Sequence, residues 1–318
     1  MSGLFIAWRR LSRRTELLAE LLGMKVAFFR DSLPYLRAMA RTAQLLRRST
    51  ARNVWIQLPQ GPLLAEAAIL KRVYGFRLVA DVHSGFLVHD DWKSFILNAP
   101  FKKLLERCDA VVVHNKQVLE LLPHGWEDRI LVVYDPWPLL EQRLRSRYAW
   151  KCPEGEEYLV MPASFAPDEP VEQVVRAFNR IKGDTKLFVT GNWGRRPWLK
   201  RYENPRVKFT GFLPDDEYYR LLACARGIIA ATTREYTALM AAWEAVALAK
   251  PLAVSSTKTL RELFSGYALF FLNDEESISE TMEMLLRVRV NEAAREELRK
   301  RTERSLEEAR KLTGSLAG

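Results

Sequence analysis

The sequence predicts an α/β protein made of two doubly wound domains in tandem, which face each other across a cleft at their strand ends. Twelve short apolar runs, rich in β-branched and aromatic residues, alternate with longer amphipathic segments. Continuous apolar strands separated by helices are typical of parallel sheets that are covered on both faces. The length of 318 residues is sufficient for two separate hydrophobic cores.

The first predicted domain covers residues 1–145. Strands are expected at its short apolar runs, at 3–8, 25–29, 53–58, 76–82, 110–115 and 129–134. Segments with helical spacing fill the intervals, at 13–23, 33–48, 62–75 and 92–108. The pattern pauses over residues 135–157, where prolines, a charge run and a Pro-Glu-Gly cluster predict a linker.

The second predicted domain covers residues 146–318 and repeats the alternation. Strands are expected at 158–164, 186–191, 206–211, 227–233, 251–256 and 268–272. The highly charged stretch 276–312 predicts helices on the outside of the protein. The last of these helices could pack back on the first domain.

Positive charge is concentrated in the first half of the chain. Of a net charge of +10, residues 1–150 contribute +9, with 23 Lys and Arg against 14 Asp and Glu. An anionic partner would therefore meet this half. The loop "WRRLSRR", with Trp8, Arg9, Arg10, Arg13 and Arg14, is predicted to contact this anionic partner or a membrane surface. The basic helix at 33–48 is either an ordinary packed helix with a wet face or a helix that lies on anionic lipid.

Nucleic acid is a disfavoured partner, because the aromatic residues follow strand and helix periodicity and do not interleave with the basic ones. The three cysteines are widely spaced and odd in number, so they predict neither a disulfide framework nor a CxxC metal site, and they favour a reducing compartment. No run approaches the roughly 18 apolar residues that span a bilayer. We expect a cytoplasmic protein, peripheral on the inner face of the membrane if it works at one.

Several catalytic signatures are absent from the sequence. It contains no GxGxxG after the first strand, no GxxxxGK[ST], no HExxH and no GxSxG. These absences disfavour a dinucleotide oxidoreductase, a P-loop enzyme, a zincin and an α/β-hydrolase. No Asp-x-Asp ends a strand either, so no metal site is predicted.

Three turns of the second domain are candidates for binding an anionic ligand. "SFAPDEP" places Ser164 at the mouth of a turn before a helix. "LFVTGNWGRRPW" ends a strand in small residues followed by two arginines, which could clamp a diphosphate or simply form a solvated loop. "ATTREYTALMAAWEAVALAKPLAVSS" carries Glu244 among apolar neighbours, where a carboxylate needs strong hydrogen bonds such as ribose hydroxyls donate.

These segments, in this order, resemble the donor half of GT-B glycosyltransferases, particularly glycosyltransferase family 4. The similarity is carried by "FTGFLPDDEYYRLLACARGIIAATT" followed by "EAVALAKPLAVSS". "SFAPDEP", "VVYDPWP" and "ADVHSGF" are also similar to turns of the β-1,4-mannosyltransferases that add the first mannose to lipid-linked chitobiose. The resemblance covers residues 1–275 and implies a GT-B fold.

The resemblance further implies a nucleotide-diphosphate sugar, GDP- or UDP-linked, as co-substrate, with no other cofactor and no metal. The donor-binding residues that it indicates are Ser164, Gly191, Asn192, Arg195, Arg196, Arg234, Glu235, Tyr236, Thr237 and Glu244. Family 4 enzymes usually carry two glutamates with seven residues between them. Here eight residues separate Glu235 from Glu244, and Tyr236 occupies the strictly spaced position.

His83, which follows the predicted strand in "ADVHSGF", is the candidate catalytic residue of the first domain. An inverting transfer needs a base, for which Asp31, Asp90 or Asp91 could compete with His83. In a retaining transfer, His83 would instead bind the sugar or the phosphate. A packed histidine at a strand end remains the structural alternative.

The predicted function is transfer of a sugar of the mannose or glucose type from the nucleotide donor to a lipid-linked or other anionic acceptor. A GT-B sugar-nucleotide epimerase or hydrolase is the alternative enzyme. A basic scaffold or nucleic-acid-binding protein without activity is the alternative outside enzymes.

Overall fold

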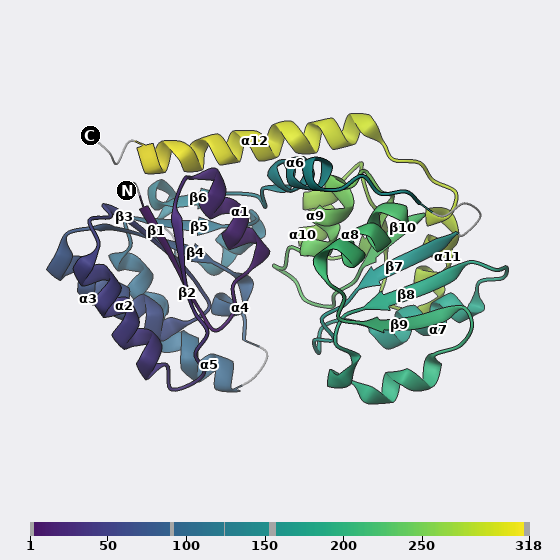
Figure 1. Cartoon of the computed structure of the whole chain (residues 1–318), viewed down its shortest axis with the longest axis horizontal. Helices are drawn as coiled ribbons and strands as arrows, with labels where there is room; N and C mark the ends of the chain where they lie inside the picture. The colour runs from purple at the N-terminus through teal and green to yellow at the C-terminus, as the bar shows by residue number, and fades with distance from the viewer. Residues whose placement is uncertain (1–2, 90–91, 124, 153–156, 315–318) are drawn as a thin grey trace. The chain divides into compact units, whose positions relative to one another are not determined.

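The computed structural model describes residues 3–89, 92–123, 125–152 and 157–314, and contains two compact units, each built on one parallel sheet (Figure 1). Unit 1 comprises Met1–Pro136 and Arg301–Gly318, and unit 2 comprises Trp137–Lys300. The predicted fold class, two doubly wound α/β domains of the GT-B type, is confirmed at the level of these two six-stranded sheets.

The sheet of unit 1 has the strand order β2-β1-β3-β4-β5-β6, with all neighbours parallel. Its strands are β1 (Gly3–Trp8), β2 (Lys25–Phe29), β3 (Asn53–Gln57), β4 (Arg77–Val82), β5 (Ala110–Val113) and β6 (Ile130–Val132). All six lie within predicted apolar runs, and β1, β3 and β5 are buried throughout, as expected for strands covered on both faces.

Helices cover both faces of this sheet. They are α1 (Arg13–Leu21), α2 (Leu36–Arg48), α3 (Gly61–Tyr74), α4 (Ser84–Leu87), α5 (Trp92–Asn98) and the 3₁₀ segments η1 (Ala99–Arg107), η2 (Gln117–Leu121) and η3 (Glu127–Arg129). The helix predicted at 92–108 is divided into α5 and η1, because Pro100 has no N–H to continue the α-helical ladder.

Unit 2 repeats the design with the strand order β12-β11-β10-β7-β8-β9. Its strands are β7 (Tyr158–Pro162), β8 (Lys186–Thr190), β9 (Val207–Gly211), β10 (Gly227–Ala230), β11 (Leu252–Ser255) and β12 (Leu269–Phe271). Its helical segments are α6 (Trp137–Arg147), α7 (Val171–Arg180), η4 (Trp193–Arg195), η5 (Pro197–Tyr202), α8 (Asp215–Cys224), α9 (Met240–Ala247), α10 (Lys258–Phe264) and α11 (Glu275–Leu285).

The chain leaves unit 1 at Pro136, nine residues before the predicted boundary at 145, because α6 packs against α9 within unit 2. The last helix, α12 (Glu292–Gly314), begins in unit 2 and ends in unit 1, where Leu306 and Ala309 join the buried core beneath α1. Ser305 accepts a hydrogen bond from the backbone N–H of Tyr134 at 3.2 Å.

One sequence-based expectation about cysteines is wrong. Cys152, just before unit 2's first strand, forms a disulfide with Cys224 at the end of α8, although the two are 72 residues apart. Cys108 is the buried free thiol, and burial raises its pKa to about 12. Spacing alone could not reveal the pair, because the fold brings the two sulfurs together. Within the part of the chain that the structure describes, no helix is long and apolar enough to cross a membrane.

Candidate functional site: a polar strand edge in unit 2 and a buried ion network in unit 1

The donor candidates of unit 2 lie in the loops that follow the carboxyl ends of β7, β8 and β10. Parallel strands end at the same edge of a sheet, which is where doubly wound folds bind ligands. Arg195 donates to the backbone carbonyl of Ser164 at 3.0 Å, which joins the loops after β7 and β8. The Thr232 hydroxyl donates to the Asp168 carboxylate at 2.7 Å, which joins the loops after β7 and β10. The structure therefore brings three of the predicted segments together.

Glu169 organises the loop that carries Ser164. Its carboxylate accepts from the hydroxyl and the N–H of Ser164, at 2.8 and 3.1 Å, and from the N–H of Phe165 at 2.7 Å. Burial raises the pKa of Glu169, and these hydrogen bonds oppose the rise. The Arg196 guanidinium donates to the carbonyls of Ala166 and Glu169, so this predicted phosphate ligand is engaged in holding the loop.

Gly191 is required by the close approach of two backbones. A Cβ at this position would lie 1.8 Å from the carbonyl oxygen of Ala163, and the φ of 100° is in the region that favours glycine. The next residue, Asn192, accepts from the N–H of Gly194 at 3.1 Å and so caps η4. The "GNWG" turn is therefore fixed in shape, as a turn that approaches a ligand closely has to be.

Arg195 and Arg234 differ in their surroundings. The Arg195 side chain is exposed, with its hydrogen bond going to a neutral carbonyl. Arg234 is half-buried, 3.7 Å from the Asp168 carboxylate, and burial lowers the pKa of its guanidinium. Of the two, Arg195 is the cation that a bound diphosphate can reach with less competition from a carboxylate.

The segment from Glu235 to Thr237 is anchored on the start of α10. The Glu235 carboxylate accepts from the N–H of Lys258 at 3.2 Å, and the N–H of Tyr236 donates to the Thr259 hydroxyl at 3.0 Å. The Thr237 hydroxyl donates back to the Glu235 carbonyl at 3.3 Å. Glu235 thus stabilises a helix N-terminus, where an acidic group is favourable, and its assignment to the donor stays a prediction.

Glu244 lies in the second turn of α9 and is buried. Its two oxygens accept from the hydroxyls of Tyr218 and Tyr219 on α8, at 2.6 and 3.2 Å. The sequence analysis missed these tyrosines, although the pair "YY" in the first turns of α8 was a visible signal. They supply the strong hydrogen bonds that the buried carboxylate requires, and they fix where it lies.

A second set of residues that sequence reasoning missed closes the ends of β10, β11 and β12. The Ser255 hydroxyl accepts from the N–H of Thr232 at 2.9 Å and donates to Asn273 at 2.8 Å, and Asn273 donates to the Thr232 carbonyl at 3.0 Å. Each buried polar atom in this triangle has a partner, so the edge is rigid where the candidate loops begin.

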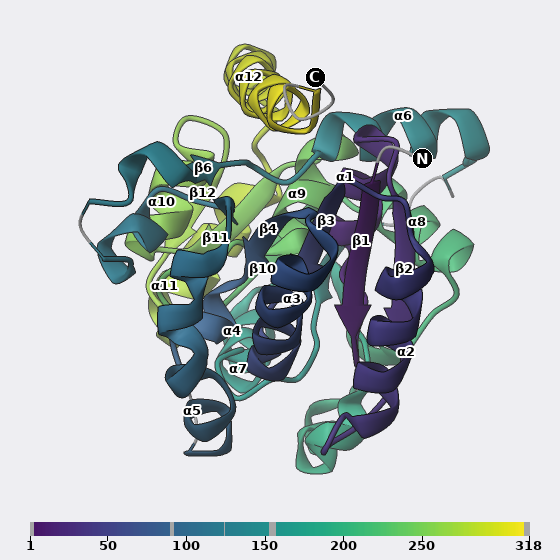
Figure 2. The ribbon, with the colours of Figure 1, turned by 90° about the vertical axis from the view of Figure 1, so that its left-hand side faces the viewer.

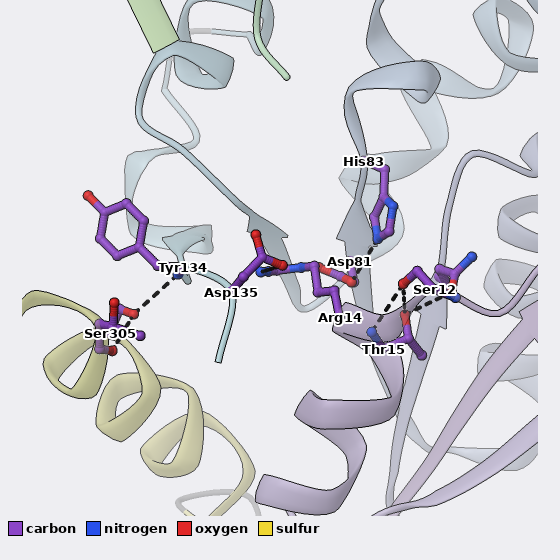
Figure 3. A network of polar contacts seen from close by, with 10 residues as sticks. Ser12, Arg14, Thr15, Asp81, His83, Tyr134, Asp135 and Ser305 are labelled. Atoms are coloured by element: carbon purple, nitrogen blue, oxygen red, sulfur yellow. Dashed lines mark hydrogen bonds and ion pairs between the residues drawn. The ribbon is translucent and has the colours of Figure 1, made fainter. Parts of the chain in front are cut away.

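In unit 1, His83 follows β4 and lies against the carboxylate of Asp81 (Figure 3). The distance from Nε2 of His83 to Oδ2 of Asp81 is 3.2 Å, and about a quarter of the imidazole side chain, 26%, is exposed. With the proton on Nε2 donated to Asp81, Nδ1 keeps the lone pair that a base requires. The sequence analysis missed Asp81, which shares a side of β4 with position 83 because side chains alternate along a strand.

Arg14 neutralises the carboxylate behind His83. It donates from Nε and Nη2 to Oδ1 of Asp81, at 3.1 Å each, and from Nη1 to Asp135 at 3.4 Å (Figure 3). Burial by itself would raise the pKa of Asp81, but Arg14 and then His83 hold it well below its ordinary value. Burial raises the pKa of Asp135, with Arg14 opposing the rise. Asp81 is therefore ionised.

His114 completes this network from the end of β5. Its ring centroid lies 6.3 Å from that of His83. Burial, together with the charge of Arg14, lowers the pKa of His114 to about 3, so this imidazole is neutral at physiological pH. The positive charge of the network then resides on Arg14.

The predicted acceptor or membrane loop "WRRLSRR" requires a correction. Trp8 is 0% exposed and donates from Nε1 to the Thr42 hydroxyl at 3.0 Å, so it cannot contact a membrane surface. Arg14 is likewise buried, in the network just described. Arg9 and Arg10 are exposed, and Arg13 lies 3.5 Å from the Glu16 carboxylate.

Two of the competing bases, Asp90 and Asp91, lie outside the described residues, whereas Asp31 lies after β2 and is half-buried. Among the side chains that the structure describes, no group of three His, Cys, Asp or Glu could hold a metal ion.

Residues 156–288 match the protein family described as "Glycosyl transferases group 1". No curated protein matches the chain in sequence. Solved structures do match it in fold. A glycosyltransferase from Rickettsia africae is 14% identical with a TM-score of 0.72, covering 99% of this chain and 98% of its own.

Two further solved structures share this fold. A Burkholderia xenovorans α,α-trehalose-phosphate synthase (UDP-forming), in complex with glucose-6-phosphate, is 11% identical with a TM-score of 0.71, covering 99% and 100% of the two chains. Anabaena HepE in complex with UDP is 14% identical with a TM-score of 0.64, covering 99% and 95%. The chain thus has the fold of GT-B glycosyltransferases, and its residues 156–288 match the family of group 1 glycosyl transferases.

Proposed function

We propose that this protein is a glycosyltransferase that moves a hexose of the mannose or glucose type from a UDP- or GDP-linked donor to a lipid-linked or other anionic acceptor, without a metal ion. The observation that carries the proposal is that two hydrogen bonds hold the loops after β7, β8 and β10 together. Arg195 donates to the Ser164 carbonyl, and Thr232 donates to the Asp168 carboxylate. The family match over residues 156–288 supports the same reaction. Because HepE was solved with UDP, UDP is the first nucleotide to test.

The donor loops have groups that can stabilise the negative charge of the leaving nucleoside diphosphate. Glycosyl transfer passes through a cationic sugar centre while the leaving diphosphate gains negative charge. Arg195 supplies a cation, and the first turn of α9, which follows Thr237, supplies backbone N–H groups with a favourable dipole. Gly191 lets the loop after β8 pack closely against the carbonyl of Ala163 in the loop after β7, which keeps these two donor loops together.

His83 is proposed to accept the proton of the acceptor hydroxyl. Asp81, kept ionised by Arg14, would orient the imidazole and stabilise the imidazolium that forms. In a retaining reaction, the same histidine would instead donate a hydrogen bond to the sugar or the phosphate.

The donor is tested by thermal denaturation with UDP, GDP and their hexose conjugates. A nucleotide at 100 times its Kd should stabilise the protein by about 2.7 kcal/mol, and Arg195→Ala should reduce this effect. If no nucleotide raises the Tm whereas oligonucleotides do, the transferase proposal fails. Release of UDP or a new sugar isomer without any acceptor would indicate a hydrolase or an epimerase. Activity retained in EDTA would support transfer without a metal.

The role of His83 is tested with His83→Ala. If His83 is the base, kcat should fall by about 100-fold or more. A rise in KM with nearly normal kcat would instead assign His83 to binding.

A further inference from the structure

The helix layer on one face of the unit 1 sheet has a basic surface. Between residues 32 and 89 the chain has eight Lys and Arg but two acidic residues, Glu66 and Asp81. Both acidic side chains are buried, Asp81 in the ion network and Glu66 on α3. Asp90 and Asp91, which follow, lie outside the described residues. Over the described part of this stretch, the outer surface therefore presents cations without exposed carboxylates.

This layer is formed by α2, α3 and α5, with η1 beside them. Helix α2 contacts α3, and α3 contacts both α5 and η1. Figure 2 turns this side of unit 1 toward the viewer. The opposite face of the sheet is covered by α1 and the end of α12, as the core residues Leu18 and Leu306 show. The layer is thus an outer surface within unit 1.

Large apolar side chains are exposed along all three helices. Leu36 of α2 is 68% exposed, with Leu33 before it, and Ile69 and Val73 of α3 are each 64% exposed. Trp92 of α5 is 69% exposed, and Phe95 and Ile96 of the same helix are exposed by more than half. With Tyr74, these residues make up eight of the fifteen exposed large apolar side chains in the described chain.

Basic side chains lie among these apolar residues. On α2 the exposed cations are Arg37, Arg41, Arg47 and Arg48, and the spacing of Arg37, Arg41 and Arg48 puts them in one stripe. Arg72 lies beside Val73 on α3, and Lys93 lies beside Trp92 on α5. The described residues of α2, α3 and α5 expose no carboxylate, whereas Glu106 of the neighbouring η1 is exposed. Aliphatic and Trp side chains next to Lys and Arg are the composition of a surface that enters the headgroup region of an anionic bilayer.

We propose that the outer surface of α2, α3 and α5 binds a membrane that contains anionic phospholipid. The arginine stripe supplies the electrostatic attraction, and Trp92, Phe95 and Ile96 enter the interface. Nucleic acid fits this surface less well, since exposed Leu, Ile and Val make no contact with phosphate. The proposal does not depend on the transferase reaction, because lipid binding requires no nucleotide sugar. It also moves the membrane side from the "WRRLSRR" loop, where Trp8 is buried, to this helix layer.

The test is co-sedimentation of the full chain with vesicles of phosphatidylcholine alone or with 30 mole per cent (roughly a third) phosphatidylglycerol. The wild type should bind the anionic vesicles, and binding should weaken as salt is raised. Arg37→Gln/Arg41→Gln/Arg48→Gln should weaken partitioning by about 100-fold, since each cation near the surface contributes about 1 kcal/mol. Trp92→Ser/Phe95→Ser/Ile96→Ser should weaken it at every salt concentration.

Trp198→Ser serves as the matched control, because Trp198 is also exposed but belongs to unit 2. Each variant should keep the wild-type Tm, since only exposed side chains change. No binding to anionic vesicles, or an equal loss in the Trp198 variant, would overturn the proposal. Tighter binding of an oligonucleotide that competes with the vesicles would also overturn it. UDP-dependent stabilisation is measured on the same samples, so a failure of the transferase proposal is seen separately.

Discussion

Replacing Asp81 by asparagine should cost unit 1 about 3 to 5 kcal/mol of stability, because it removes one partner of a buried ion pair. Arg14 is 4% exposed and makes two hydrogen bonds of 3.1 Å to Asp81 but one of 3.4 Å to Asp135. Asparagine keeps the shape and removes the charge. The buried guanidinium is then left with the weaker partner, and that uncompensated charge is the origin of the cost.

The loss is measured by urea unfolding, with hydrogen exchange of the β4 amides reporting on unit 1 in particular. Glu16→Gln is the matched control, since Glu16 pairs with Arg13 at 3.5 Å where both side chains are about one-third exposed. Exposed pairs contribute about 0 to 1 kcal/mol, so this change should be nearly neutral.

The same variant gives a test by pH. The pKa of Asp81 is lowered in the folded protein, so its contribution to stability is present above the unfolded pKa of about 3.9 and is lost as pH falls below it. As pH is lowered, the free energy of unfolding of Asp81→Asn should therefore fall less than that of the wild type. If Asp81→Asn and Glu16→Gln destabilise equally, or if the acid decline is unchanged, the buried ion pair does not have the strength inferred here.

Three further predictions concern single positions. Cys152→Ser should lower the free energy of unfolding by about 4 kcal/mol, from the 72-residue separation of the bridged cysteines, and reductant should lower it equally in the wild type but not in the variant. Gly191→Ala should lower the free energy of unfolding by more than about 2 kcal/mol and abolish UDP-dependent stabilisation. Gly183 also has a positive φ, but no atom lies near its missing Cβ, so Gly183→Ala should cost about 1 to 2 kcal/mol. Equal losses in the two variants would argue against the close contact between Gly191 and the Ala163 carbonyl. Burial raises the pKa of Glu66 to about 7, so between pH 4.5 and 7 the folded protein holds a proton on Glu66 that the unfolded chain has released. The free energy of unfolding of the wild type should therefore fall by up to about 3 kcal/mol as pH rises through this range. Glu66→Gln should remove this pH dependence in denaturation curves, and a pH dependence that persists would contradict the raised pKa of Glu66.

Local pattern was sufficient to predict the strands but not the environment of the charged residues. The buried strands β3 and β5 could be predicted because a short continuous apolar run is stable in the interior of a sheet that is covered on both faces. Arg14 was predicted as a surface residue, since nothing near it in the sequence neutralises it. Its partners Asp81 and Asp135 are 67 and 121 residues away, and the fold alone makes them neighbours.

The candidate site shows the same division. The sequence by itself determined the α/β class, the two sheets and the loops that meet at the carboxyl edge of unit 2, because those depend on periodicity and on the geometry of parallel strands. Tertiary structure alone decided that Arg14 lies against Asp81, that Tyr218 and Tyr219 hold Glu244, and that Cys152 reaches Cys224. Hydrogen bonds, ion pairs and disulfides act over a few ångströms in space, and residues this far apart along the chain meet because the fold brings them together.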